Sequence, residues 1–413
     1  MRIGNGWSKR AAGMLTVCFL LSLAAGQLTR AQDVPIYKVD PFWPKPLPNH
    51  WSFQQFVDIY VGKDDHIWAI NRPDDARPDE LGAMRSPAQG ECCVLGPEIL
   101  EFDAEGNVLK AWGAKDYAPG WPQRLQTLTV DREENVWLSG TRPGDSIIKF
   151  SKDGKFLWDF GHRGPKVPAA EVKQNNQQTD IFPAGIEAFD LDENAHEIYI
   201  TDSQPNKRVL VYDMDTGAFK RGWGGHGTPL SEIDNDPIPP YDISGPPPDL
   251  KQFTPALHCI HISVDGLVYV CERASDRIQV FTKQGKFVTS FFVHPSTPAR
   301  GSTCGGIWNA TLPMCGTVFN MTFSHDPKEK YLLVEDGTND TIWILNRSDG
   351  KPVGSFGGNG RYAGNLHWPD GIAMDSKGNV YVGEVEDGKR IQKFILTNGD
   401  GKSTEPHPTT AYK

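Results

Sequence analysis

The sequence contains no apolar run long enough to cross a lipid bilayer, which takes roughly 20 apolar residues. Its clearest apolar stretch, residues 11–23, is shorter than that and follows a positively charged start. A short apolar core behind positive charge is typical of a secretory signal. We therefore expect residues 1–31 to be a signal peptide, with cleavage after Gly26 also compatible. We expect the mature chain to be exported to a periplasmic or extracellular compartment, with no integral membrane segment.

Basic runs and several catalytic motifs are also absent. The chain has 52 Asp and Glu against 42 Lys and Arg, a net charge of −10. An acidic chain without basic clusters is not expected to bind nucleic acid or anionic lipid. There is no Cys-x-x-Cys-His for haem and no glycine loop after a strand for phosphate. The Gly-x-Ser-x-Gly turn is missing too, which excludes hydrolases that hold their serine in it.

Cysteine is scarce, with seven among 413 residues and one of these inside the expected signal. The rest are even in number in a chain expected to be exported, which favours disulfides. Cys259 and Cys271 lie symmetrically about a tight turn at Asp265 and Gly266. Residues placed in this way face each other on neighbouring strands, so we predict a bridge between them.

The remaining cysteines fall in two other stretches. Cys304 and Cys315 bracket one loop, and we predict that a bridge between them ties it down. Cys92 and Cys93 are adjacent, and they either form a strained vicinal disulfide or pair elsewhere or stay free. The sequence leaves these alternatives open.

One pattern is repeated six times along the chain. Its last copy, residues 367–394, has three short apolar runs, the first two joined by a tight Asp-Ser-Lys-Gly turn. Other copies span residues 121–150, 182–212 and 253–281, and two degenerate copies begin near residues 53 and 315. All but the last continue into a fourth apolar run. Four strands repeated at such a period predict an all-β, six-bladed β-propeller, because each blade buries its faces only against its neighbours.

The last copy ends after three strands, and residues 36–43 form a spare strand before the first copy. We predict that this N-terminal strand completes the last blade and closes the ring. The expected organisation is a signal, one propeller at 32–399 and a C-terminal tail at 400–413. The blades are expected at about 51–113, 121–161, 182–224, 253–293, 314–357 and 367–399.

The loops of the expected blades are unequal. Long insertions, several rich in proline, occupy residues 73–96, 162–181, 225–252 and 294–313. All of them fall on the face of the ring opposite the tight turns between first and second strands. Stiff insertions on one end of a rigid scaffold are expected to wall one mouth of the central channel. We expect a monomer whose mouth binds a small polar molecule or a peptide.

Aligning the blades on their Val-Tyr-Val runs places polar residues at the start of the inner strands. Asp370, His258, Glu187 and Gln126 share one position, with Asp58 and Asn320 close to it in the degenerate blades. Oxygen ligands with one imidazole suit a divalent ion such as Ca²⁺ or Zn²⁺, and ordered water is the alternative occupant. His261 is offset from His258 by an odd number, which predicts that it points away from the channel.

A second tier of charged residues is expected on the same face, in the loops between second and third strands. Both signs converge there, which suits a polar or zwitterionic ligand, although salt bridges between blades are the structural alternative. Four of these residues are expected to face the mouth: Arg142, Asp202, Glu272 and Glu384. Three blades carry an arginine at the same position just before the third strand: Arg208, Arg277 and Arg390. This repetition favours a structural role for these arginines.

The runs Pro-x-Gly-Ile, Asn-Val-Tyr-Val and Arg-Ile-Gln-x-Phe resemble NHL repeats over residues 51–394. The runs TDSQPNKRVLVYDMDTGAFKRGWG and FTPALHCIHISVDGLVYVCERASDRIQVFTKQGKFV resemble the peptidyl-α-hydroxyglycine α-amidating lyase family. That resemblance implies a zinc ion on three axial histidines, a tyrosine base, an arginine and a structural calcium. The reaction it implies releases glyoxylate from a hydroxyglycine-extended peptide.

Residue by residue, the resemblance to the lyase family is incomplete. His258 matches one axial histidine and Arg72 matches the catalytic arginine, whereas Gln126 and Asp370 replace the other two histidines and Gln204 replaces the tyrosine. A zinc site normally needs three protein ligands. The resemblance therefore implies the fold, with Arg72 as a partner for a substrate carboxylate, and leaves the lyase chemistry without its base.

These features favour an exported propeller that binds a small polar ligand at its walled mouth, with or without a metal. The alternative is a metal-dependent enzyme, either lyase-like or a lactonase of the gluconolactonase type. In the lyase-like case Glu187, His258 and Asp370 would form a changed set of metal ligands. In the lactonase case Glu187, Asn320 and Asp370 would surround calcium.

Overall fold

Each sequence repeat forms a four-stranded antiparallel sheet whose strands pair in chain order, as the fourth blade illustrates. There β16 (Leu257–Ile262), β17 (Leu267–Glu272), β18 (Arg277–Thr282) and β19 (Phe287–Phe292) lie side by side. The turn between β16 and β17 contains Gly266 at φ +78°, a left-handed conformation that glycine adopts without strain.

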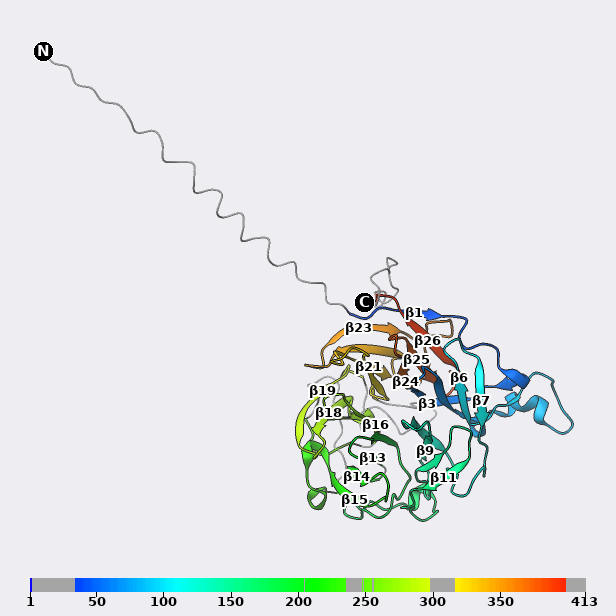
Figure 1. Ribbon diagram of the computed structural model, residues 1–413, viewed down its shortest axis with the longest axis horizontal. Helices are drawn as coiled ribbons and strands as arrows, with labels where there is room; N and C mark the ends of the chain where they lie inside the picture. The colour runs from blue at the N-terminus through cyan, green and yellow to red at the C-terminus, as the bar shows by residue number, and fades with distance from the viewer. Residues whose placement is uncertain are drawn as a thin grey trace. The chain divides into compact units, whose positions relative to one another are not determined.

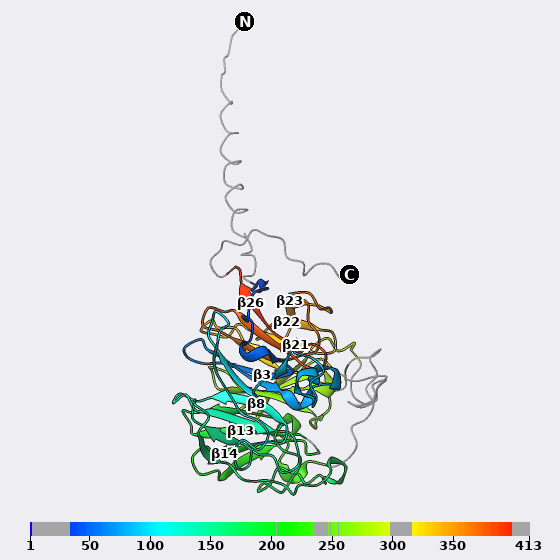
Figure 2. The same cartoon turned by 90° about the vertical axis from the view of Figure 1, so that its right-hand side faces the viewer.

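The computed structural model describes Met1, Pro247 and residues 34–203, 205–234, 249–254, 256–297 and 316–398. Within the unit Pro35–Lys413, six such sheets are arranged in a ring (Figure 1), and Figure 2 shows the same blades from the side. Blade 1 contains β3 (Gln55–Val61), β4 (Ile67–Arg72), β6 (Ile99–Phe102) and β7 (Val108–Trp112). Blade 2 contains β8 (Leu125–Val130), β9 (Val136–Gly140), β10 (Ile148–Phe150) and β11 (Phe156–Asp159).

The remaining blades follow the same order. Blade 3 contains β12 (Ala188–Asp192), β13 (Glu197–Asp202), β14 (Arg208–Asp213) and β15 (Phe219–Trp223). Blade 5 contains β20 (Met321–Phe323), β21 (Tyr331–Asp336), β22 (Thr341–Asn346) and β23 (Pro352–Gly357). Blade 6 contains β24 (Pro369–Met374), β25 (Val380–Glu384) and β26 (Ile391–Leu396).

The N-terminal strand closes the ring, as the sequence predicts. β1 (Tyr37–Asp40) pairs antiparallel with β26, with Tyr37 opposite Leu396 and Asp40 opposite Lys393. In Figure 1 the blue β1 lies beside the red β26. Tyr37 is buried, and its ring lies 4.8 Å from that of Phe356 in the preceding blade. Blade 6 is thus built from both ends of the chain.

The core lies between blades, because the flat faces of neighbouring sheets cover each other. One cluster joins Tyr199, Val209 and Val211 of blade 3 to Val268 and Val270 of blade 4. Residues that alternate along a strand contribute to the clusters on its two sides, so both faces of each sheet are buried. This arrangement explains why the repeats read as nearly continuous apolar runs.

The first long insertion contains short elements of its own. It holds η2 (Pro73–Asp75), η3 (Pro78–Met84) and β5 (Val94–Leu95), and β5 pairs in parallel with β2 (Trp51–Ser52). Cys92 and Cys93 form a vicinal disulfide there. The other short helices are η1 (Pro48–His50), η4 (Ala169–Glu171), η5 (Gly225–Gly227), η6 (Leu230–Glu232) and η7 (Arg273–Ser275). Within the described ranges, no helix is long and apolar enough to cross a membrane.

The predicted bridge between Cys259 and Cys271 is present, with their Cα atoms 4.9 Å apart on paired strands. Three other sequence-based expectations lie outside the described residues. They are the signal cleavage region before Val34, the tail at 400–413 and the pair Cys304 and Cys315.

Candidate functional site

The polar residues predicted at the channel axis occupy β-bulges at the starts of the inner strands. In β16, Leu257 pairs with Glu272 and Cys259 pairs with Cys271, so His258 is the extra residue. The same irregularity skips Asp370 in β24. A bulge turns its extra residue out of the alternating pattern of the strand. The bulges therefore direct His258 and Asp370 to the axis.

Related geometry positions the other axial residues. The register of β8 shifts between Leu125 and Leu128, across Gln126. Glu187 and Asn320 lie directly before β12 and β20, at the same ends of their blades. The alignment of the repeats therefore identifies one level of the channel, and the structure gathers these polar side chains there.

His258 has a defined protonation state. Its Nδ1 lies 2.8 Å from the carbonyl oxygen of Phe319. Because a carbonyl only accepts hydrogen bonds, Nδ1 carries the proton and Nε2 carries a lone pair. Burial lowers the pKa of His258 to about 3, and the nearby guanidiniums of Arg273 and Arg72 act in the same direction. The imidazole is therefore neutral at pH 7.

Two carboxyls flank this imidazole on opposite edges. Glu187 Oε1 lies 3.6 Å from Nε2, and Asp370 Oδ1 lies 3.6 Å from Nδ1 of His258. Asp370 Oδ1 is buried without a hydrogen-bond partner among the described residues. Burial raises the pKa of Asp370 to about 7, against the opposing effect of Arg72 and Arg273.

A cavity of about 20 Å³ lies on the axis beside these groups, large enough for one water-sized occupant. Asp58, Asn320 and His261 also line it. His261 donates to or accepts from Asn320 Oδ1 at 2.9 Å, so the prediction that it points away from the channel is wrong. The bulge at His258 shifts the alternation on which that prediction relied.

As the axial side chains stand, the atoms that could bind a metal do not converge on one point. Only Nε2 of His258 has a lone pair to offer, and Asp370 lies on the other edge of the ring. The amide oxygen of Gln126 accepts a hydrogen bond from Arg72 Nη2. A divalent cation would also face the guanidiniums of Arg72 and Arg273, which act on both carboxyls.

Three arginines meet at a hollow of about 220 Å³ between blades 1 and 2, on the mouth face. We call it the mouth hollow; its lining is Arg72, Asp74, Asp75, Glu98, Gln123, Arg124, Leu125 and Arg142. Arg124 Nη1 donates to both carboxylate oxygens of Asp75, at 2.7 and 2.9 Å. Glu98 accepts from the indole of Trp121 at 2.6 Å. Burial raises the pKa of Glu98 to about 7, which reduces its negative charge.

Arg72 and Arg142 retain unused donors at this hollow. Arg72 Nε donates to the carbonyl of Leu125 at 2.7 Å, and its Nη2 donates to Gln126, which leaves Nη1 without a hydrogen bond among the described residues. In the same ranges the guanidinium of Arg142 makes no hydrogen bond. Burial lowers the pKa of Arg142, and the nearby Arg124 adds to the effect. Burial lowers the pKa of Arg72 to about 9, with Arg124 again adding to the effect. Two incompletely neutralised cations thus face one open space.

The other acids predicted at the mouth are engaged by arginines. Asp202 accepts from Arg208 Nε and Nη2 at 2.8 and 2.6 Å, and both side chains are fully buried. Two further corners repeat this arrangement, with distances of 2.7 Å from the arginine Nε: Glu272 with Arg277 and Glu384 with Arg390. The recurring arginines therefore have the structural role that their repetition indicates. We do not include their acids in the mouth hollow.

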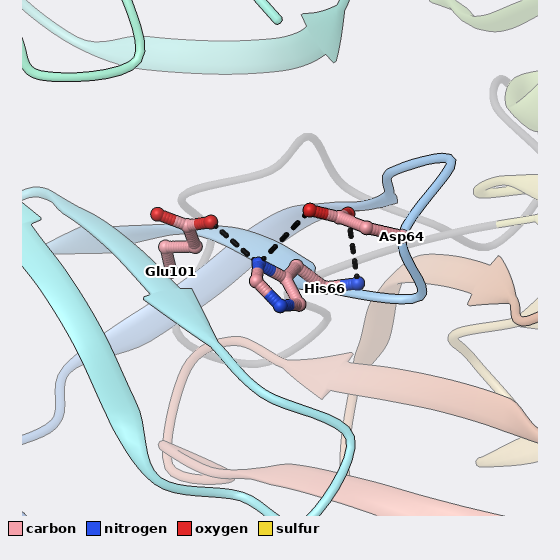
Figure 3. Close-up of side chains that lie close together, drawn as sticks. All are labelled: Asp64, His66 and Glu101. Atoms are coloured by element: carbon pink, nitrogen blue, oxygen red, sulfur yellow. Dashed lines mark hydrogen bonds and ion pairs between the residues drawn. The ribbon is translucent and has the colours of Figure 1, made fainter.

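The opposite face of the ring holds a cluster of one histidine and two acids. His66 Nδ1 lies 2.7 Å from Glu101 Oε1 and 3.2 Å from Asp64 Oδ2, as Figure 3 shows. Among the residues that the structure describes, this is the only such group of three with its ligand atoms within 4.8 Å of one another. The histidine contacts both carboxylates through one nitrogen, as an N–H donor does, and Lys110 lies 3.9 Å from Glu101. The spacing of these residues in the sequence did not reveal the cluster, because Glu101 lies on β6, which follows β4 only after a long insertion.

Gln204, the residue at the position of the lyase tyrosine, lies outside the described residues.

Comparison with known proteins found no matching protein-family model. NHL repeat-containing protein 3 of Homo sapiens is 24% identical over 315 residues, covering 73% of this chain and 74% of that protein. Its Mus musculus counterpart is 23% identical over 312 residues, covering 72% and 73%. Selenomethionine-substituted virginiamycin B lyase from Staphylococcus aureus aligns with a TM-score of 0.46 at 13% identity, covering 88% of this chain and 100% of that one.

Proposed function

We propose that this chain, a six-bladed NHL-type β-propeller, is an exported protein that binds a small polar ligand through a carboxylate at the mouth hollow. The observation that carries the proposal is the pair of guanidiniums, Arg72 and Arg142, with free donors facing about 220 Å³ of open space. The neighbouring guanidinium of Arg124 lowers the pKa of both arginines, and a bound anion would relieve that repulsion. An arginine fork matches a carboxylate with two parallel hydrogen bonds.

The neutral and acidic groups around the hollow suit the rest of a polar or zwitterionic ligand. Asp74 is exposed and makes no side-chain hydrogen bond within the described ranges, whereas the neighbouring Asp75 is paired with Arg124. A ligand ammonium group placed beside Asp74, with its carboxylate on Arg142, would be matched in both charges. The hollow's volume of about 220 Å³ is below the roughly 300 Å³ at which drug-sized pockets begin, so the ligand it suits is no larger than an amino acid or a peptide terminus.

Calorimetric titration with N-acylglycine, glycine and gluconate as probes tests the proposal. We expect at least one probe to bind and Arg142→Ala to weaken its binding about tenfold or more, since a charge-assisted hydrogen bond contributes about 1.5–3 kcal/mol. Arg142→Lys should restore only part of the affinity, because it keeps the charge and loses the fork. Arg132→Ala is the matched control, since Arg132 is exposed on the other face. Unchanged binding by Arg142→Ala would overturn the proposal.

A metal-dependent enzyme at the axis is the second candidate, and one observation favours it. His258 presents an Nε2 lone pair, and Asp370 presents a buried oxygen without a partner among the described residues, beside a cavity of the right size for one ion. If side chains rearranged to bring these atoms together, the metal would polarise a carbonyl or activate water there. Metal analysis of wild type and His258→Ala tests this candidate, together with assays for glyoxylate release and lactone opening. If wild type holds a metal that His258→Ala loses, and wild type shows either of these two activities, the enzyme would replace the binding proposal.

A further inference from the structure

Blade 5 lacks an arginine that three other blades use to neutralise a buried acid. The acid at the end of the second strand faces an arginine across the sheet in blades 3 and 4, where Asp202 pairs with Arg208 and Glu272 with Arg277. Blade 6 has the corresponding ion pair between β25 and β26. In blade 5 the acid is Asp336, and the residue opposite it is Thr341. The fold therefore places a negative charge here without its usual cation.

Asp336 is fully buried and accepts hydrogen bonds only from neutral groups within the described part of the chain. Its donors are the backbone and side-chain N–H groups of Asn339, at 2.9 and 2.8 Å, and the indole of Trp343 at 2.9 Å. Donors of this kind favour the ionised carboxylate without cancelling its charge. Burial raises the pKa of Asp336 to about 6, so it carries a charge at pH 7.

A second buried acid lies beside it in blade 4. Asp276 precedes β18 and has no exposed surface, and neither of its carboxylate oxygens has a hydrogen-bond partner in the described part of the chain. The backbone N–H and hydroxyl of Thr317 lie close enough to Asp276 to favour its ionised form, although the hydroxyl donates to the carbonyl of Val293 at 2.6 Å. A Cβ atom added to Gly316 would lie 3.3 Å from Asp276 Oδ1, so backbone covers the acid closely. Burial raises the pKa of Asp276 to about 8, and the carboxylate of Asp336 adds to the effect.

Two neighbouring buried carboxyls without an arginine need either a bound proton or a bound cation. We propose that Asp276 and Asp336 hold a divalent cation, Ca²⁺, at the interface of blades 4 and 5. Calcium prefers oxygen ligands and tolerates irregular geometry, and the two carboxylates offer oxygens of the kind it binds. This site lies away from the axial residues, and the inference is independent of the ligand proposed for the mouth hollow.

The cation would also be connected to two described residues, Thr297 and Gly316. Asn339, which holds Asp336, also donates to Thr297 Oγ1 at 2.8 Å. Thr338 donates to the carbonyl of Gly316 at 2.6 Å. Thr297 and Gly316 are the residues on either side of the segment 298–315. A cation at this interface would therefore support the contacts that hold Thr297 and Gly316 against blade 5.

The experiment compares Ca²⁺ content and thermal unfolding of the full chain, with Ca²⁺ or with EGTA. Wild type is expected to retain about one Ca²⁺ and to melt at a higher temperature in Ca²⁺ than in EGTA. Asp276→Asn should lose both the ion and the Ca²⁺-dependent rise. Thr341→Arg should restore the missing arginine, melt at the same temperature in both conditions and bind no Ca²⁺. This variant also decides the question if Asp276→Asn fails to fold.

Asp202→Asn is the matched control, because it removes a buried acid that already has an arginine. It should lower the melting temperature equally with Ca²⁺ and with EGTA. The proposal is overturned if wild type binds no Ca²⁺; if Asp276→Asn is then as stable as wild type, a proton satisfies the pair. It is also overturned if Asp276→Asn and Thr341→Arg keep the ion, since the ion then lies elsewhere.

Discussion

Replacing Arg277 by alanine should destabilise the whole ring, because this side chain neutralises a buried acid and caps a loop. Its Nε and Nη2 donate to the two oxygens of Glu272 at 2.7 and 2.8 Å. Its Nη1 donates to the carbonyl of Leu250 at 2.6 Å, and Nη2 also reaches that of Gln252 at 3.0 Å. Neither charged group of the pair is exposed.

The expected loss of unfolding free energy depends on the hydrogen bonds that Glu272 keeps in the variant. Removing one partner of a buried ion pair costs about 3–5 kcal/mol, because the other charge stays buried. Glu272 still accepts from Thr254 N at 2.8 Å and from Gln279 at 2.7 Å. These neutral donors support the charge in part, so we expect a loss of about 3 kcal/mol for Arg277→Ala.

Urea unfolding followed by tryptophan fluorescence measures this loss. A double variant, Glu272→Gln with Arg277→Met, should recover much of the stability, because it leaves no buried charge. Arg132→Ala, which removes an exposed arginine, should change the unfolding free energy by less than about 0.5 kcal/mol. A loss below about 1 kcal/mol for Arg277→Ala, or a double variant no better than the single one, would refute the reasoning.

Three further predictions concern the ring, a disulfide and pH. Deleting the chain through β1 (Tyr37–Asp40) should lower the melting temperature, since β26 becomes an open edge; an unchanged calorimetric scan would contradict this. Replacing Cys259 and Cys271 with serine should cost about 3 kcal/mol in urea unfolding, from the loop entropy of a bridge spanning 12 residues, and equal midpoints would argue against it. Because the pKa of His258 falls from 6.5 to about 3 on folding, the unfolded chain binds the extra proton and stability should fall as pH drops from 6.5 toward 3, by up to about 1.4 kcal/mol per unit. His258→Gln should flatten that part of the pH profile, and parallel profiles would count against the buried neutral state.

The repeats made the propeller and its closure predictable, because a strand pattern repeated six times has few ways to bury its faces. The same alignment predicted that His258, Asp370 and Glu187 share one level of the channel. The alignment did not predict the directions in which these side chains point. The bulge that directs His258 also brings His261 to the axial cavity, and a bulge adds a residue without leaving a mark in the apolar pattern.

The charges at the mouth were harder to interpret from sequence. The alignment grouped Glu272 with Arg142, although one is buried against an arginine and the other faces open space. Distinguishing them needs the register between second and third strands, which depends on the length of each turn. The same register shows that Thr341 stands where an arginine is expected, a difference visible only once the strands are paired.

Closure by β1 also determines the order in which the protein can fold. The backbone N–H of Ile36 donates to the side chain of Asn398, a contact between residues 362 positions apart. Blades 1 to 5 each need only a local stretch of chain, whereas blade 6 needs both ends. Contacts this distant in sequence form slowly. Until β26 is synthesised, the chain is an open arc whose first and last blades expose apolar flanks, and that arc is the species most prone to aggregate.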